Sequence, residues 1–474
     1  MPPQIIPRNA HPISRKNIHP DALKVMYRLM RKGFTAYLVG GGVRDLILGR
    51  TPKDFDVGTN ATPNQIKKAF RNCFIIGRRF RLAHIRFGDQ IIETSTFRRC
   101  PEPDENEDGD LYVFRDNCYG TPEDDALRRD FTINALFYEL ESFSVIDHVG
   151  GLSDIHNRTI RCIGDPNIRF REDPVRMIRA VRFASRLGFQ IEPATFNAIL
   201  RHHQDILKAA PARVFEELIK LFAYGSGEKA IRLLHKTGLL GSLLPEVSDF
   251  LDHGHDQNQA SSLWSWLRHL DDRIRATDSL NPILVFATLF CAPMHRHLAG
   301  QASTNDTEKI PSLYLRLTEL LTPICIRISM PKLMTMRMIQ VMANQSRFVP
   351  DKRKRFSKRG FVAQETFPET LALYEIGLRV AGEDLQSIEP WSALRRDVET
   401  QLPHSNTNAR VATKRTAKKG NRQVKAGSNK PTGNADATSM NETPAPVAQA
   451  EEVRHSRPPR KRSRRRKPPA LSQA

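Results

Sequence analysis

The segment from residue 34 to residue 57 places three consecutive glycines after an extended apolar run and before a short helical pattern. Residues 34–39 predict a strand, residues 40–42 a tight turn, and residues 43–48 a brief helix that ends at Gly49. A strand, a glycine turn and a helix in this order let backbone N–H groups approach an anion closely. This segment therefore predicts an α/β unit whose glycine turn can hold a phosphate.

Two aspartates follow the glycine turn. Residues 54–57 read DFDV, which predicts a strand with Asp54 and Asp56 on the same face. Two carboxylates on one strand can bind divalent ions that activate an attacking hydroxyl and neutralise a triphosphate. Each feature alone is more often structural, since most such acidic pairs are surface pairs and most glycine turns bind nothing. Their combination with Arg44 within 17 residues indicates a phosphate and metal site.

The rest of the N-terminal pattern alternates helices and strands. We expect helices at 20–32, at 62–70, and from Asp125 as N-cap to Phe137. A hairpin is expected at 81–97, turning at 88–89, and a strand near 144–149. The acidic residues 101–110 lack apolar periodicity and predict a loop. From 173 to about 380 the pattern is mainly helical, with helices expected at 194–207, 212–223 and 228–234.

These patterns predict four regions. We expect an α/β head with a small mixed sheet over residues 1–155, a helical neck over 156–240, and a helical body over 241–400. Residues 401–474 contain no Phe, Tyr or Trp and hold 17 Lys and Arg against 4 Asp and Glu, which predicts a disordered basic tail. Its basic extreme is a candidate RNA-binding cluster, a localisation signal or solvated charge, and composition does not separate these. The cluster consists of Arg460, Lys461, Arg462, Arg464, Arg465 and Arg466.

Composition narrows the class and the compartment. A net charge of +21 is uncommon for an enzyme of small anionic metabolites and usual for a protein that meets nucleic acid. The six cysteines form no CxxC pair, so they indicate neither a zinc ribbon nor a disulfide framework. This favours a reducing compartment. No stretch approaches about 18 apolar residues, so we expect a cytoplasmic protein without a transmembrane segment. His253, His255 and Asp256 suggest a metal motif, but no second histidine-aspartate set follows, which favours a histidine-rich loop.

Four motifs resemble the signature of class II nucleotidyltransferases, the superfamily of tRNA CCA-adding enzymes and bacterial poly(A) polymerases. They are LVGGGVRD at 38–45, LGRTPKDFDV at 48–57, RRDFTIN at 128–134, and GDP at 164–166 with REDPVRMIR at 171–179. They occur in the family's order. The resemblance implies a nucleotidyltransferase head, an all-α neck and body, and template-independent addition of nucleotides to RNA 3′ ends.

The resemblance also implies roles for individual residues. Asp54 and Asp56 would hold two Mg²⁺ ions, and Gly41 and Arg44 would contact the triphosphate. Arg129 would contact a phosphate or the ribose. Asp130 is a third acidic position associated with the active site, although beside two arginines it is equally a structural ion pair or cap. Glu93, in the second strand of the hairpin, is the reserve candidate for a third carboxylate.

The helix expected at 173–187 has two faces. Arg176, Arg179, Arg182 and Arg186 share one face, and apolar residues occupy the other. The resemblance implies that Glu172, Asp173 and Arg176 read the edge of the base and that Arg179 lies at the bound nucleotide. Asp173 followed by Pro174 also predicts a helix N-cap with a first-turn proline.

Several features favour the poly(A) polymerases within this superfamily. The chain resembles them in the run GRRFRLAH at 77–84, the triple glycine, the acidic insert and the basic tail, and in ISRK at 13–16 and ALKVMYR at 22–28. We expect a monomer that adds AMP from ATP to RNA 3′ ends, releases pyrophosphate and acts in mRNA processing and RNA decay. RNA-decay proteins are candidate partners of the tail. The alternatives are a CCA-adding enzyme and a noncatalytic RNA-binding protein, which would not need paired metal carboxylates.

Overall fold

The computed structural model describes residues 2–77, 81–99, 118–252, 257–299, 310–348 and 356–401. Side chains are not described at 257–261, 296, 297, 299 and 401. The acidic segment 101–110, part of the run 77–84, the histidine-rich segment 253–256 and the basic cluster of the tail lie outside these ranges. The described residues belong to one compact unit, Met1–Pro403.

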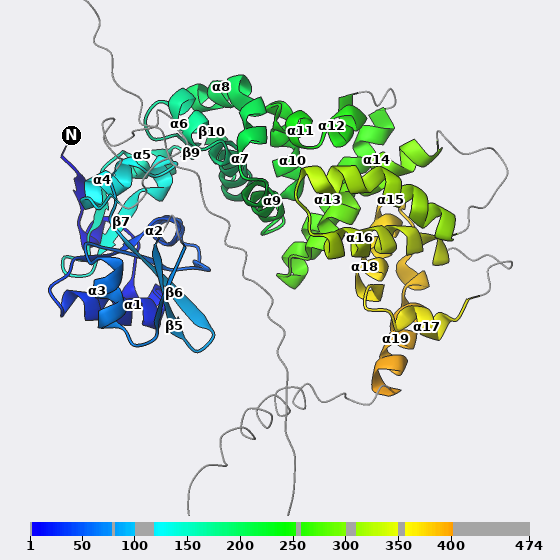
Figure 1. Ribbon diagram of the computed structural model, residues 1–474, viewed down its shortest axis with the longest axis horizontal. Coiled ribbons are helices and arrows are strands. Elements are labelled where there is room, and N and C mark those ends of the chain that lie inside the picture. The colour runs from blue at the N-terminus through cyan, green and yellow to red at the C-terminus, as the bar shows by residue number, and fades with distance from the viewer. Residues whose placement is uncertain are drawn as a thin grey trace, which may run out of the picture. The chain divides into compact units, whose positions relative to one another are not determined.

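An eight-stranded mixed sheet forms the N-terminal part (Figure 1), with the strand order β1-β8-β7-β2-β3-β6-β5-β4. Within this described sheet β3 and β6 are parallel, and all other neighbours are antiparallel. The strands are β1 Gln4–Ile6, β2 Ala36–Val39, β3 Asp56–Thr59, β4 Cys73–Ile76, β5 Leu82–Phe87, β6 Gln90–Thr96, β7 Leu136–Glu139 and β8 Val145–Asp147. The predicted α/β head with a small mixed sheet is confirmed.

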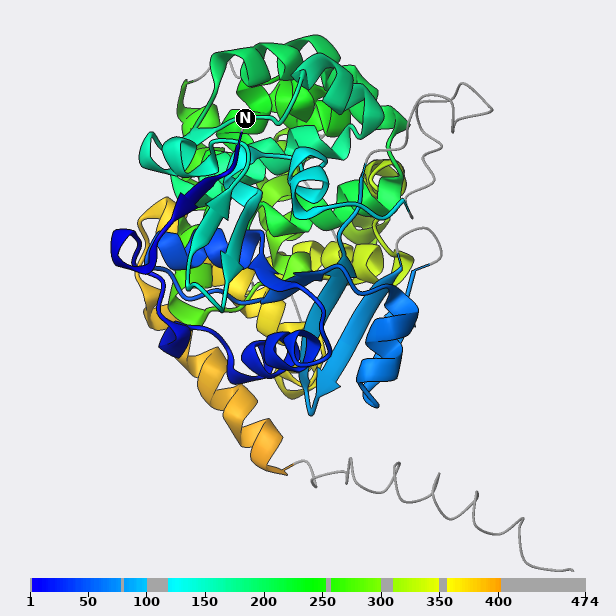
Figure 2. The same ribbon diagram turned by 90° about the vertical axis from the view of Figure 1, so that its left-hand side faces the viewer.

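Two helices cover the sheet where their sequences predict them. Helix α1 (Pro20–Met30) buries Val25 and Leu29, and helix α3 (Pro63–Ala69) begins with a capping box between Thr62 and Gln65. Their buried residues join one hydrophobic core with the strands. The predicted hairpin is β5 and β6, the long blue arrows lying side by side in Figure 2. Strands β1 and β4 were not expected, because three or four residues give too little periodicity to detect.

The predicted helix from Asp125 to Phe137 is wrong. Helix α4 spans Pro122–Leu127 with Thr121 as its N-cap, and a 3-10 turn, η4 (Thr132–Asn134), leads into strand β7. Phe137 lies in that strand and is fully buried. A strand buried on both faces is a continuous apolar run, which periodicity does not distinguish from a buried helix.

The acidic strand and the short helix begin elsewhere than expected. Strand β3 begins at Asp56, so Asp54 lies before the strand and the two aspartates do not share one strand. The reason is the pairing partner: β2 ends at Val39, which lies opposite Asp56, so no residue of β2 pairs with Asp54. Helix α2 spans Gly41–Ile47 and thus includes two of the three glycines.

The rest of the described chain is mainly helical. A small parallel sheet of β9 (Thr159–Ile160) and β10 (Gln190–Ile191) lies within 156–240, which corrects the expectation of a purely helical neck. The early helices are α5 Gly151–His156, α6 Pro166–Glu172, α7 Val175–Leu187, α8 Pro193–His202, the 3-10 turn η5 His203–Lys208, α9 Pro211–Lys220 and α10 Gly227–Lys236. The later ones are α11 Leu239–Leu243, α12 Pro245–Asp252, α13 Gln257–Thr277, α14 Pro282–Ala299, α15 Ile310–Arg327, α16 Lys332–Ala343, α17 Lys358–Val362, α18 Phe367–Ala381 and α19 Glu389–Gln401. In the part of the chain that is described, no helix is long and apolar enough to cross a membrane.

Candidate active site

A cleft of about 1150 Å³ gathers most of the residues that the motifs singled out. Its walls come from the glycine turn, the aspartates before and in β3, the segment 125–134, and helices α6, α7 and α9. The predicted residues in its lining are Gly41, Arg44, Asp54, Asp56, Arg129, Asp130, Glu172, Asp173, Arg176, Arg179, Arg182 and Arg186. The cleft therefore combines several aspartates near the sheet with a dense set of arginines from the helices.

The glycine turn allows two close approaches. Gly40 has φ 71°, and a Cβ there would lie 2.8 Å from the Arg129 guanidinium. A Cβ at Gly42 would lie 3.4 Å from the carbonyl oxygen of Asp54. The turn needs glycine at position 40 because its positive φ strains any L side chain, and the nearby Arg129 guanidinium adds a contact that would have to move.

The carboxylates of Asp54 and Asp56 differ in environment. Asp54 is exposed, whereas Asp56 is partly buried and lies opposite Glu93 of the parallel strand β6. Burial, reinforced by the negative charges of Glu93 and Asp54, raises the pKa of Asp56 to about 6, and Arg129 opposes this rise. Glu93 is half-exposed, with its carboxylate 3.3 Å from His84 Nε2. The negative charges of Glu93 and Asp54 thus disfavour the ionisation of Asp56, and a divalent cation bound beside it would relieve this.

We expect Asp56→Asn to stabilise the metal-free protein. The pKa of Asp56 is about 6 in the folded protein against an ordinary 3.8, so ionised Asp56 lowers the free energy of unfolding. This destabilisation is absent below pH 4 and complete above pH 6. The substitution should therefore raise the free energy of unfolding by about 1–3 kcal/mol at pH 7.5 and by almost nothing at pH 4. Thermal unfolding with EDTA at the two pH values measures this, and an equal gain at both would contradict it.

Arg44 is buried in a polar network. Its side chain is 2 % exposed, and its Nε and Nη2 donate to Asp45 Oδ1 at 2.9 and 2.7 Å. Its Nη1 donates to the side-chain oxygen of Asn134, and Arg186 bonds the other oxygen of Asp45 at 2.8 Å. Arg44 therefore lines the cleft with a guanidinium that is already held by two partners.

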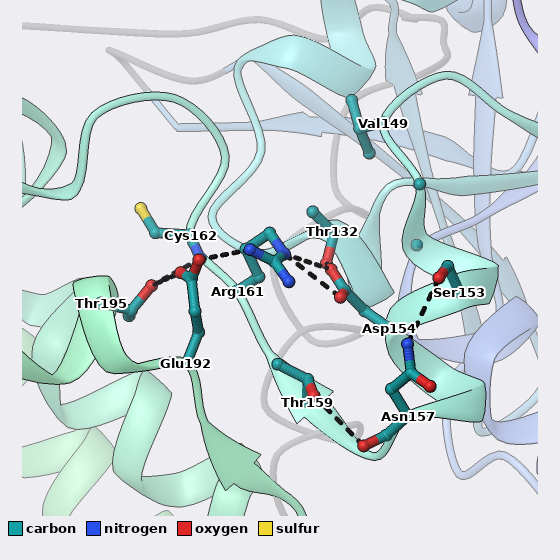
Figure 3. A network of polar contacts seen from close by, with 12 residues as sticks. Thr132, Val149, Ser153, Asp154, Asn157, Thr159, Arg161, Cys162, Glu192 and Thr195 are labelled. Atoms are coloured by element: carbon teal, nitrogen blue, oxygen red, sulfur yellow. Dashed lines mark hydrogen bonds and ion pairs between the residues drawn. The ribbon is translucent and has the colours of Figure 1, made fainter.

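Arg129 is oriented in a similar way. Its guanidinium bonds Asp125 Oδ2 at 2.9 and 3.2 Å and donates to the carbonyl oxygen of Asn134 at 3.1 Å. The turn η4 that contains Asn134 is itself tied down, because Thr132 donates to Asp154 at 2.6 Å and Arg161 bonds the same carboxylate (Figure 3).

The same network reaches the beginning of α8. Arg161 also pairs with Glu192, which accepts from the Thr195 hydroxyl at 2.7 Å, and this hydroxyl accepts from the backbone N–H of Cys162 (Figure 3). These bonds join the turn that carries Asn134 to the first helices after the sheet, so they fix the wall of the cleft.

Asp130 is saturated with donors. Its Oδ1 accepts from Asn134 Nδ2 at 3.0 Å and from the backbone N–H of Phe131 at 2.8 Å, and its Oδ2 accepts from Arg179 Nε at 2.7 Å. Burial would raise the pKa of Asp130, but the Arg179 guanidinium and these hydrogen bonds outweigh it and hold that pKa well below its usual range. This geometry is that of a structural ion pair between the head and helix α7.

Helix α7 is oriented by a second carboxylate that the motifs did not indicate. Glu217 of α9 is 5 % exposed and lies 3.6 Å from Arg179, 3.1 Å from Arg182 and 3.4 Å from Lys220. The one feature of the sequence that could have indicated Glu217 is that it is an acidic residue among apolar ones in an amphipathic helix. Asn134, Asp45 and Glu217 all position arginines of the cleft, and all three went unpredicted. Asn134 and Glu217 bond arginines that are distant in sequence, whereas Asp45 directly follows its partner Arg44.

The residues expected to read the base already form ion pairs with arginines. Glu172 Oε2 accepts from Arg169 at 2.8 Å and from Arg176 at 3.1 Å. Asp173 bonds Arg213 through both carboxylate oxygens, at 3.1 and 2.8 Å. The predicted capping role of Asp173 is wrong: it is the C-cap of α6, Pro174 is the N-cap of α7, and no side chain caps α7. The expectation failed because the bidentate bond to Arg213 takes the carboxylate instead.

This constellation matches known proteins. Residues 36–161 match a family model described as "Poly A polymerase head domain", and residues 188–251 match one described as "Probable RNA and SrmB-binding site of polymerase A". The chain is 40 % identical over 398 residues to poly(A) polymerase I of Salmonella typhi, covering 82 % of this chain and 85 % of the relative. The chain belongs to the bacterial poly(A) polymerase I family. Its counterpart in Escherichia coli O6:H1 is 41 % identical over 397 residues, covering 82 % of this chain and 84 % of the relative.

CCA-adding enzymes are related to this family more distantly. That of Bacillus velezensis is 35 % identical over 229 residues, 48 % of this chain and 56 % of the relative. A crystal structure of the Bacillus stearothermophilus CCA-adding enzyme in complex with CTP superimposes with a TM-score of 0.59 at 25 % identity, covering 81 % of this chain and 84 % of that one. A tRNA nucleotidyltransferase complexed with a primer tRNA and an ATP analogue superimposes with a TM-score of 0.53 at 20 % identity, covering 79 % and 99 %. The predicted fold class and family are confirmed.

Proposed function

We propose that the chain transfers AMP from ATP to the 3′ ends of RNA without a template and releases pyrophosphate. The chain is a nucleotidyltransferase of the poly(A) polymerase family, which supports the reaction and the substrate class. The observation that carries the residue assignment is the cleft itself, where Asp54 and Asp56 face the arginines of α7. Purified protein, an oligo-RNA primer and each nucleoside triphosphate singly, with products sized on a gel, test the proposal.

The residues present fit Mg²⁺ brought in by the nucleotide. Among the described residues no group of three or more His, Cys, Asp or Glu side chains is arranged to hold a metal ion. Mg²⁺ commonly binds one or two carboxylates and completes its shell with water and substrate phosphates. Asp54 and Asp56 would hold two such ions, which supply activation of the 3′-hydroxyl and neutralisation of the triphosphate.

The chain's own groups bind and orient the reactants. The backbone of Gly41 and the guanidinium of Arg129 flank the turn beside the aspartates, where a triphosphate would lie. Arg44, held by Asp45 and Asn134, supplies a fixed positive charge to the same region. Such preorganised charge costs no rearrangement as negative charge develops on the phosphate.

Glu172, Asp173, Arg176 and Arg179 would contact the nucleotide on the helical side. We expect Arg176→Ala to relax the choice among nucleoside triphosphates by about 10-fold, because a planar donor fork is lost and Glu172 loses one of its two partners. The ratio of kcat/KM for ATP to that for CTP measures this, with Arg71→Ala, at an exposed position between α3 and β4, as a control outside the cleft. An unchanged ratio with weaker RNA binding would contradict the assignment.

A tRNA CCA-adding activity is the alternative supported by a specific observation, the similarity to CCA-adding enzymes in sequence and fold. Incorporation of CTP onto a tRNA lacking its 3′ end would favour it. The greater identity and coverage for the poly(A) polymerases favour adenylate addition. A noncatalytic RNA-binding protein would turn over no ATP in the presence of Mg²⁺.

RNA contacts are proposed for the helical part and the tail. Residues 188–251 match a family region described as binding RNA and SrmB, which makes this segment a candidate for protein contacts as well. The boundaries 155, 240 and 400, the monomeric state, and contacts of the tail with RNA-decay proteins remain proposals.

Removal of residues 401–474 should leave turnover at saturating primer near normal. The tail lacks aromatic residues that could stack on bases, so its contribution to RNA affinity should be electrostatic. The shortened chain should show a higher KM for RNA and a shallower dependence of binding on log salt. Binding isotherms at several salt concentrations on two unrelated RNAs measure this, and equal slopes would show that the tail does not contact RNA.

A further inference from the structure

A second cavity, of about 510 Å³, lies in the N-terminal part, and none of its lining residues lines the active-site cleft. Its walls include three cations, Arg8, Arg15 and Lys16, and no Asp or Glu is among its described lining residues. An apolar and aromatic surface completes it. A cavity with three cations and no carboxylate in its walls favours an anionic ligand.

Tyr138 gives this cavity a buried hydrogen-bond donor. The residue is fully buried in strand β7, and its hydroxyl has no hydrogen-bond partner among the described residues. Burial raises the pKa of Tyr138, and the positive charges of Arg8 and Arg15, which line the same cavity, oppose that rise. A buried hydroxyl without a partner is costly. It is also shielded from solvent, so an anion would reach it only by displacing the side chains that cover it, and would then remove that cost.

The aromatic wall is held rigidly. The Arg15 guanidinium lies 4.6 Å from the centroid of the Phe143 ring and donates to the Tyr27 hydroxyl at 3.1 Å. Phe143 has φ 55° in the turn between β7 and β8, a conformation that disfavours bulky side chains. Its carbonyl oxygen is hydrogen-bonded to His11 Nε2 at 2.8 Å, which helps hold the turn. Backbone strain that the surroundings maintain is a feature of binding sites.

We propose that this cavity binds a nucleotide unit of single-stranded RNA, with its phosphate between Arg8, Arg15 and the Tyr138 hydroxyl and its base against the aromatic wall. The proposal rests on the proposed function, since RNA is the primer of that reaction. A carboxylate-bearing peptide would use the cations but leave the aromatic wall without a partner, whereas a nucleotide uses both. The volume also exceeds what a lone phosphate would need.

Two segments near the N-terminus supply much of the cavity's lining. Arg15 and Lys16 belong to the segment 13–16, and Leu23 and Tyr27 belong to the segment 22–28. The reaction proposed above assigns no role to either of them.

The experiment compares RNA binding by four full-length variants, without ATP or Mg²⁺. Arg15→Gln and Tyr138→Phe alter the cavity, while Lys67→Gln on α3 and Tyr119→Phe are matched controls at exposed positions outside it. We expect about a 5- to 10-fold loss of affinity for a 20-nucleotide oligoadenylate with each cavity variant, and no change with the controls. Thermal stability of Tyr138→Phe should not fall, since the hydroxyl that it removes has no protein partner.

Competition separates the sources of the ligand. If the cavity variants lose binding of free 5′-AMP while their affinity for the oligoadenylate is unchanged, the cavity binds a free nucleotide and the RNA proposal is overturned. A polyglutamate peptide whose binding falls in the cavity variants, with RNA binding unchanged, would also overturn it. Because the assay contains no ATP, it tests RNA binding by the cavity even if the protein adds no adenylate. Unchanged RNA affinity in both cavity variants would reject this inference and leave the proposed function untouched.

Discussion

Replacing Asp54 or Asp56 by asparagine is expected to lower the rate of adenylate addition by about 10³-fold or more. Each carboxylate would hold a metal ion that provides several kcal/mol of charge stabilisation in the transition state, and each 1.36 kcal/mol is a factor of ten in rate. Single-turnover extension of a labelled primer at saturating ATP measures the effect. RNA affinity should change little, because the primer contacts other groups.

Asp89→Asn is the matched control, since Asp89 is an exposed aspartate in the turn between β5 and β6. It should retain full activity. Asp56→Asn should also unfold at a higher temperature than the wild type without metal, so its loss of activity could not be attributed to unfolding. Activity within 10-fold of the wild type in both aspartate variants would reject the two carboxylates as metal ligands.

The parts of the site that the sequence predicts are those whose residues lie close together along the chain. The glycine turn, the aspartates and the arginine face of α7 each lie within one stretch of chain, and the structure brings all of them to one cleft. Turn chemistry and helical periodicity are local signals, so they survive without knowledge of the tertiary fold.

The parts that could not be predicted depend on pairing between distant segments. Whether Asp54 belongs to a strand depends on where β2 ends, and whether Leu136 to Glu139 form a strand depends on β2 and β8 on either side. The partner of Asp173 is an arginine 40 residues away. Competition from such partners overrides local rules for capping and periodicity.

Asp130 and Glu93, the two candidates for a third active-site carboxylate, differ in burial and in hydrogen bonding. Asp130 is nearly buried and is bonded by Arg179, Asn134 and the backbone of Phe131. Glu93 is half-exposed, lies opposite Asp56 and raises the pKa of that aspartate. Because its hydrogen-bonding capacity is largely used, Asp130 is better suited to orient α7. Glu93 does not line the cleft, but it lies beside Asp56 with a carboxylate that could help bind a metal ion there.

Asp130→Asn and Glu93→Gln should therefore fail in different ways. Asp130→Asn leaves the Arg179 guanidinium without its main counter-charge, so we expect a loss of about 2–4 kcal/mol in the free energy of unfolding at pH 7. This difference should shrink as the pH falls below about 4, because a depressed pKa stabilises the fold only where the unfolded carboxyl is ionised. Glu93→Gln should change stability by less than about 0.5 kcal/mol yet lower kcat by about 10²-fold and raise the Mg²⁺ concentration needed for half-maximal activity. Urea unfolding and Mg²⁺ titrations of primer extension, each scaled to the folded fraction, measure both. Full activity per folded molecule in Glu93→Gln, with none in Asp130→Asn, would reverse the assignment and make Asp130 the third carboxylate.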